Sequence, residues 1–199
     1  MKQIHVYSDF VCPYCLLAEP LIREAAAAEA AEIIWHPFEL RPDPVPTLRP
    51  EDPYLPEIWQ RSVYPLARRL GQEITLPTIS PQPRSALAFE GFAFASDHDR
   101  GHEYTLAVFN AFFVQDRDIG DIEVLVALAE AVGLDGDVLR QALQDGRYRT
   151  RHAEALREAE AQQIKAVPTI VIGTARIEGM PTAEGLRSAL QSLAAEEQV

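Results

Sequence analysis

The first forty residues show a pattern of apolar and polar positions that predicts a strand, a helix and a second strand. Residues 2–8, KQIHVYS, are rich in β-favouring side chains and contain no turn residue, which predicts a strand. Residues 13–30 are rich in Ala, Leu and Glu, which favour a helix, and residues 33–38, IIWHPF, predict a second strand. Together these segments predict a βαβ unit with parallel strands and a right-handed crossover.

The middle of the chain changes first to a proline-rich stretch and then to a long helical block. Between residues 41 and 56 proline recurs at 42, 44, 46, 50, 53 and 56, which is typical of a surface linker. Residues 57–164 are helical in pattern, and glycines and prolines divide them into five or six helices. In one of these, Asp121 is placed to cap the N-terminus and Gly133 to end the helix.

The last forty residues return to strands and end in a helix. TIVIG and ARIEG predict two strands joined by Gly173 and Thr174, and glycine at the first loop position suits a type II′ hairpin. Thr182 can cap a final helix with leucines at helical spacing. The order is β-α-β, then helices, then β-β-α, which predicts an α/β core interrupted by an all-helical insertion.

Composition and charge narrow the possible partners. The 199 residues carry a formal net charge of −12, and clustered Lys and Arg, which phosphate binding requires, are lacking, so no nucleic-acid partner is expected. No segment approaches the roughly 18 consecutive apolar residues of a membrane span. The start of the sequence does not have the pattern of a secretory signal, so we expect a cytoplasmic protein.

The two cysteines of the chain, Cys12 and Cys15, carry the candidate chemistry. In a reducing compartment such a pair is more often catalytic, redox-active or metal-binding than structural. Pro13 suits the first helical position, which places Cys12 at the N-cap, where free N–H groups and the helix dipole stabilise a thiolate. Cys15 lies one turn further and faces the core, so Cys12 is expected to attack a disulfide and Cys15 to resolve the mixed disulfide.

Other interpretations of the two cysteines remain open. A zinc site needs about four ligands, and since a second CxxC is missing, the candidates to complete it are His98 and His102, whose spacing does not match a zinc finger. Two inert thiols are a further possibility. His5 and His36 fall in predicted strands, where histidine is more often a packed or hydrogen-bonded residue than a catalyst.

Three further features have both a structural and a functional interpretation. Pro168 stands directly before a predicted strand; if the Val167–Pro168 bond is cis, the backbone of Val167 would be free to pair with a substrate chain. Lys165 could support a thiolate but is more typical of a solvated helix end. Six phenylalanines at helical spacing could line a groove but are more typical of a core: Phe89, Phe92, Phe94, Phe109, Phe112 and Phe113.

These motifs carry a family resemblance. CPYC at a helix start, a helical insertion and VPT before a hairpin resemble the DsbA-like proteins of the thioredoxin superfamily, and SDFVCPYC, HPFELRPD and AVPTIVIGTARIEGMP resemble their FrnE-like branch. This branch is related to 2-hydroxychromene-2-carboxylate isomerases and kappa-class glutathione transferases. The resemblance implies a thioredoxin fold in two parts, residues 1–45 and 163–199, around a helical insertion at 46–162.

The resemblance also implies roles for single residues. Cys12 would be the nucleophile, Cys15 the resolving thiol, Pro168 the cis-proline opposite them, and Val167 the residue whose backbone meets the substrate. Pro13 and Tyr14, between the cysteines, would support the helix start. The related isomerases and transferases generally have serine at the leading position, so the paired cysteines favour thiol-disulfide exchange, and Gly179 to Pro181 depart from the family's GAQ-like turn.

The sequence therefore supports three hypotheses of function. The first is a thiol-disulfide oxidoreductase acting on a disulfide-containing protein or a low-molecular-weight thiol, without metal or cofactor, with glutathione a possible co-substrate and a homo-oligomer possible. The second is a glutathione-dependent isomerase or transferase. The third is a zinc-binding or chaperone-like module, for which bound zinc would be diagnostic.

Overall fold

The structure is a computed structural model that describes residues 2–196, so that Met1 and residues 197–199, the outer ends of the two predicted thioredoxin-like parts, lie outside the described residues. Four strands form one sheet in the order β2-β1-β3-β4. Their bounds are β1 Gln3–Ser8, β2 Glu32–Pro37, β3 Thr169–Ile172 and β4 Ala175–Glu178. β1 pairs parallel with β2 and antiparallel with β3, and β3 pairs antiparallel with β4, which confirms the predicted βαβ unit and hairpin.

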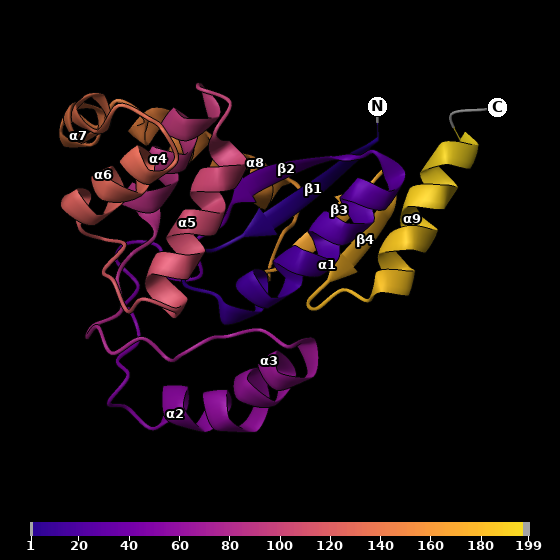
Figure 1. Cartoon of the computed structure of the whole chain (residues 1–199), viewed down its shortest axis with the longest axis horizontal. Helices are drawn as coiled ribbons and strands as arrows, with labels where there is room; N and C mark the ends of the chain where they lie inside the picture. Colours follow the sequence, from indigo (N-terminus) through magenta and orange to yellow (C-terminus); the bar gives the residue numbers. More distant parts are fainter. Residues whose placement is uncertain (1, 197–199) are drawn as a thin grey trace.

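Two helices cover one face of this sheet. α1 (Pro13–Glu29) connects β1 to β2, and α9 (Ala183–Glu196) follows β4 and packs beside α1 (Figure 1). Because side chains alternate along a strand, Ile4 and Val6 of β1 point to this face and are buried with Ile22 of α1 and Leu186 of α9. Thr182 caps α9, as predicted, by accepting a hydrogen bond from the backbone N–H of Gly185 at 3.0 Å.

The inserted helices lie between β2 and β3 in the sequence. α2 (Tyr54–Ile58), the π-helical η1 (Trp59–Val63) and α3 (Tyr64–Leu70) follow one another without a break. The others are α4 Ala86–Ser96, α5 Gly101–Phe113, α6 Ile122–Ala131, α7 Gly136–Gln144 and α8 Arg149–Ala161. Counting α2 to α3 as one, the part of the chain that the structure describes has six helices between these strands, within the predicted range. The domain boundaries at residues 46 and 162 stay a prediction.

The proline-rich linker ends earlier than the sequence suggests. α2 begins at Tyr54 rather than at residue 57, and Pro56 lies in its first turn. Proline is tolerated there because the first N–H groups of a helix have no partner within the helix. A proline-rich composition therefore does not by itself mark where the linker stops.

Most of the inserted helices are gathered beside β2, whereas α2 and α3 lie apart from them (Figure 1). α5 and α8 contact β2. Asp121 caps α6 by accepting the N–H of Glu123, and Gly133 follows its end with a positive φ of 83°, as the sequence predicts. Among residues 2–196, the structure contains no helix with the length and apolar character that a membrane crossing requires.

Candidate active site

The cysteine pair lies where β1 leads into α1. Cys12 is the N-cap, with φ −95° and ψ 112°, and Pro13 is the first helical residue. The N–H of Cys12 donates to the carbonyl of Asp9, and the N–H of Cys15 to the carbonyl of Cys12, each at 3.0 Å. These bonds fix both cysteines on the first turn, as the spacing predicts, and the two thiols are free.

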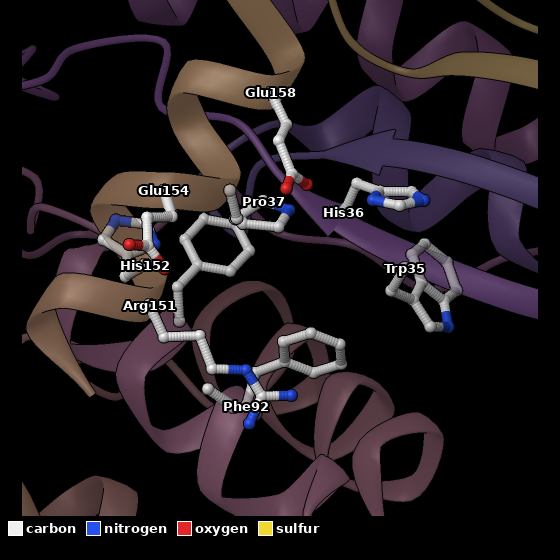
Figure 2. A pocket seen from close by; sticks show the side chains of 11 residues that line it. Trp35, His36, Pro37, Phe92, Arg151, His152, Glu154 and Glu158 are labelled. Carbon is white, nitrogen blue, oxygen red and sulfur yellow. The ribbon is translucent and has the colours of Figure 1, made fainter. Parts of the chain in front are cut away.

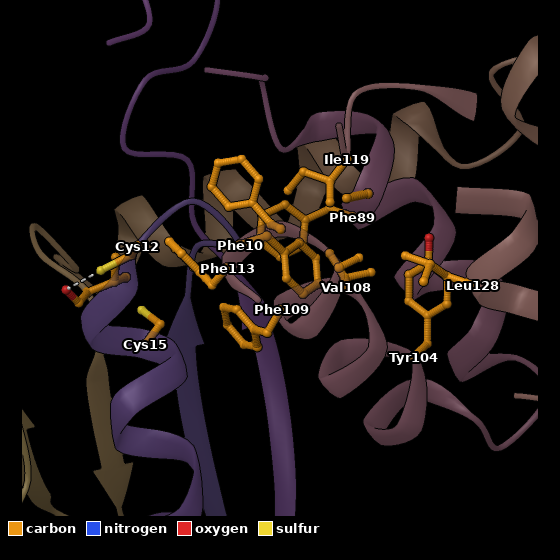
Figure 3. Close-up of a cluster of buried hydrophobic side chains, with 14 of the residues drawn as sticks. Phe10, Cys12, Cys15, Phe89, Tyr104, Val108, Phe109, Phe113, Ile119 and Leu128 are labelled. Atoms are coloured by element: carbon orange, nitrogen blue, oxygen red, sulfur yellow. Dashed lines mark hydrogen bonds between the residues drawn. The ribbon is translucent and has the colours of Figure 1, made fainter. Parts of the chain in front are cut away.

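The loop before β3 faces Cys12. The Val167–Pro168 peptide bond is cis, and the Cys12 thiol donates to the Val167 carbonyl over 3.6 Å (Figure 3). The Pro168 carbonyl accepts the N–H of Gly179 at 2.8 Å, which links this loop to the turn after β4. The structure therefore brings together the residues that the resemblance pairs, although they are 155 positions apart in the sequence.

The two sulfurs have different environments. Cys12 is 4% exposed and Cys15 is 1% exposed, which is the predicted order. Burial raises the pKa of the Cys15 thiol well above its usual range, and the neighbouring Cys12 sulfur raises it further. Cys15 is thus held as a neutral thiol as long as Cys12 forms no disulfide.

Asp9 is a buried carboxylate beneath the cysteine loop. It is 0% exposed, and its side chain accepts the N–H of Val11 at 3.3 Å and the N–H of Leu40 at 2.7 Å. Burial raises the pKa of Asp9 to about 6, and the nearby Glu39 also raises it, although the hydrogen bonds act in the opposite direction. Asp9 therefore ties the loop that precedes Cys12 to the segment after β2.

Sequence reasoning missed Asp9, although its position offered a signal. Asp9 directly precedes Phe10 and Val11 in the stretch SDFVC, and a carboxylate beside such an apolar run needs a partner if it is buried.

A second buried acid, Glu39, has its partner far away in the sequence. Its carboxylate lies 2.6 Å from Nε2 of His152 on α8, and both side chains are less than 10% exposed.

Tyr14 connects the cysteine motif to the helical insertion. Its hydroxyl donates to Oγ of Ser62 in η1 at 2.7 Å. Pro13 and Tyr14 are both half-buried, so the dipeptide between the cysteines is in part accessible. No local pattern in the sequence indicates the contact with Ser62, because it depends on how η1 packs against α1.

The histidines that could have completed a zinc site lie elsewhere. Nδ1 of His98 is bonded to the carbonyl of Phe94, and Nδ1 of His102 accepts from the indole N–H of Trp35. Over residues 2–196 we find no group of three or more His, Cys, Asp or Glu side chains placed to hold a metal ion.

His5 and His36 are packed sheet residues, as the sequence favours. Nδ1 of His5 lies 2.9 Å from Nε2 of His36, and the ring of Tyr7 stacks on His36. Burial, together with the positive charge of His5 when protonated, lowers the pKa of His36 to about 4. Lys165 is exposed at the end of the helical block, as its structural interpretation expects.

The six phenylalanines at helical spacing are mainly core residues, and two of them also line a cavity. Five of the six are buried and Phe92 is half-buried. Phe109 and Phe113 of α5 pack with Phe10 and the two cysteines in one buried cluster, which joins the cysteine motif to the helical block (Figure 3). Phe89 and Phe92 also line a cavity of about 270 Å³ beside β2, with Trp35, His36, Arg151 and His152 around it (Figure 2).

Comparisons with known proteins agree with this architecture. The family model of the DSBA-like thioredoxin domain matches residues 3–191. The chain is 48% identical over 178 residues to the uncharacterized protein YwbO of Bacillus subtilis, which covers 88% of this chain and 89% of that protein.

Solved structures share the fold at low sequence identity. A probable DsbA oxidoreductase from Streptomyces coelicolor superposes with a TM-score of 0.82 at 22% identity, covering 98% of this chain and 91% of the other. A 2-hydroxychromene-2-carboxylate isomerase gives 0.79 at 19% identity, covering 98% of each chain. The cytosolic disulfide reductase DsbM of Pseudomonas aeruginosa, solved with GSH, gives 0.70 at 18% identity, covering 99% and 100%. The predicted thioredoxin fold with a helical insertion is confirmed.

Proposed function

The chain belongs to the family of DsbA-like thioredoxin domains, and from this premise we propose that it is a thiol-disulfide oxidoreductase that works through Cys12 and Cys15. The family and its structural neighbours support an enzyme of the oxidoreductase or isomerase kind. The observation that carries the finer proposal is the placement of the Cys12 sulfur at the start of α1, 3.6 Å from the Val167 carbonyl, with Cys15 one turn behind it.

The reduction of a substrate follows from this placement in two exchange steps. The Cys12 thiolate attacks one sulfur of the substrate disulfide, which forms a mixed disulfide and releases the other sulfur as a thiolate. The Cys15 thiolate then attacks the Cys12 sulfur, which leaves a Cys12–Cys15 disulfide and a second substrate thiolate. The enzyme loses two electrons, the substrate gains them, and solvent supplies the protons; the reverse sequence oxidises a dithiol.

The pKa of Cys15 orders these two steps. Part of the increase in this pKa comes from the Cys12 sulfur, through both its hydrogen bond and its charge. Once Cys12 is bound in a mixed disulfide it carries no negative charge, so the contribution of that charge to the increase disappears. Cys15 then loses its proton more easily, at the stage where its attack is required.

Two variants test the proposal. Cys12→Ser should abolish the acceleration of insulin reduction over the rate with dithiothreitol alone, because no nucleophile remains at the helix N-cap. Cys15→Ser, reduced beforehand and freed of reductant, should accumulate a mixed disulfide with the substrate, detectable by mass spectrometry as an adduct that later addition of dithiothreitol removes. Far-ultraviolet circular dichroism of both variants verifies that they fold. Equal insulin reduction by wild type and Cys12→Ser would refute the proposal.

A glutathione-dependent isomerase or transferase is the second candidate, because a 2-hydroxychromene-2-carboxylate isomerase shares the fold. Such a reaction transfers no electrons to a second thiol, so it would survive Cys15→Ser. The presence of both cysteines on the first turn of α1 favours the oxidoreductase.

The partners follow from the same chemistry. DsbA-like oxidoreductases act on thiol or disulfide substrates. We propose a cytoplasmic enzyme that needs no cofactor besides its dithiol. Its substrate is a disulfide-containing protein or a low-molecular-weight thiol, glutathione included, and a homo-oligomer is possible. Fractionation of cells with an antibody, and gel filtration of the purified chain, test the location and the oligomeric state.

A further inference from the structure

A cationic groove begins directly beside the cysteine motif. It has a volume of about 720 Å³, is open to solvent, and is lined by Tyr14 of the motif, by Arg61, Arg68 and Arg69 from η1 and α3, and by Met180. Met180 follows Gly179, whose N–H binds the carbonyl of Pro168. The groove therefore has the CPYC dipeptide at one border and the turn attached to the cis-proline loop at another.

The three arginines have no partner within the described part of the chain. All three side chains are exposed. None forms a salt bridge or a side-chain hydrogen bond with another residue between 2 and 193, whereas eight other arginines are in ion pairs. In a chain with a net charge of −12, a groove bordered by three unpaired cations is a local reversal of the overall sign.

The spacing of the charges suits an extended segment. Arg61 and Arg69 are eight positions apart on continuous helix, which at 1.5 Å per residue separates them by about 12 Å along the axis. An extended chain covers this length with about four residues. Pro65 and Leu66 add half-buried apolar surface between the charges, which suits the stems of long side chains.

We propose that this groove binds an acidic segment of a protein substrate, next to the cysteine that reacts with Cys12. The proposal rests on the proposed function, because it assigns the substrate class of the same site. A substrate cysteine at the Cys12 sulfur places its neighbouring residues over Tyr14, from where carboxylates on the following residues reach the guanidinium groups. Arginine suits this role because its planar fork binds carboxylates in a bidentate manner.

Peptide disulfides of opposite charge test the proposal. Two ten-residue peptides carry one cysteine as a mixed disulfide with 2-mercaptoethanol, flanked on each side by two Glu or by two Lys. Their reduction by the full chain, reduced beforehand and freed of reductant, is followed in a single turnover, in which the enzyme dithiol becomes a disulfide. We expect the Glu peptide to react about tenfold faster at low salt, and the ratio to approach one at high salt.

A variant and a matched control assign this preference to the groove. Replacing the three groove arginines by Gln should remove the preference for the Glu peptide, while the long side chains keep their packing. The control carries the same change of net charge at exposed arginines outside the groove: Arg147, Arg157 and Arg187 to Gln. It should keep most of the preference, because screening limits the effect of distant surface charges.

The outcomes separate this proposal from the proposed function. Reduction of bis(2-hydroxyethyl) disulfide, which is neutral, reports the redox chemistry alone, so failure with all substrates would overturn the proposed function. Equal rates with the Glu and Lys peptides, or an equal loss of preference in the control, would overturn the groove proposal only. If dithiodiglycolate, a small dicarboxylate disulfide, depends on the groove arginines as strongly as the Glu peptide, the occupant is a small anion and the peptide proposal is wrong.

Discussion

The buried carboxylate of Asp9 predicts an unusual dependence of stability on pH. Its pKa rises from the ordinary 3.8 to about 6 in the folded protein, chiefly because the side chain is removed from water. Between these two values the folded chain keeps a proton on Asp9 that the unfolded chain has lost. Raising the pH across this range therefore favours unfolding, by about 3 kcal/mol in total at roughly 1.4 kcal/mol per pH unit. The stabilising contribution of Asp9 is complete below pH 3.8 and is lost as the pH rises through 6.

Urea unfolding of wild type and Asp9→Asn from pH 4 to pH 7 measures this contribution. Asn cannot titrate, and its effect on the bonds from Val11 and Leu40 is the same at every pH, so the difference between the two proteins isolates the proton. We expect wild type to lose about 2 kcal/mol relative to the variant over this range, because part of the total is already lost by pH 4.

Asp97→Asn provides a control of opposite sign. Partial burial raises the pKa of Asp97, but hydrogen bonds from Arg151 and Tyr148 outweigh it and hold the pKa below its usual value. Wild type should therefore gain stability relative to Asp97→Asn as the pH rises towards and through the ordinary value of 3.8, so the urea series for this pair is extended below pH 4. A pH-independent difference between wild type and Asp9→Asn, or one of the same sign as the control, would refute the reasoning about burial.

Two substitutions test the packing around the helical block. His152→Phe keeps a ring to stack on Phe89 but leaves the Glu39 carboxylate buried without its partner. We therefore expect the free energy of unfolding to fall by about 3 kcal/mol. A fall below about 1 kcal/mol would contradict this role of the pair. Gly91→Ala places a Cβ against the Tyr104 hydroxyl oxygen, which should lower stability by about 1–3 kcal/mol in thermal unfolding. Adding Tyr104→Phe should restore part of the loss, and no restoration would mean that the hydroxyl is not the obstacle.

Local rules decided much of the fold in advance. The β-rich run before Pro13, the helix that this proline begins and the glycine hairpin between β3 and β4 were all predictable, because propensity, capping and turn chemistry act between residues close in the chain. The same rules placed Cys12 and Cys15 on one helical turn. The start of α2 was predicted three residues late, because prolines in a first helical turn and prolines in a linker look alike in the sequence.

The sequence by itself therefore determined the order of elements and the dithiol at the start of α1, since both depend on neighbours along the chain. Only the tertiary structure brought Val167 to Cys12, buried Asp9 beneath the loop and joined Tyr14 to Ser62. These features arise where segments distant in sequence pack together, and a burial that raises a pKa has no signature in local periodicity. The cationic groove has the same origin, because η1 and α3 acquire their relation to the cysteines only when the insertion packs against α1.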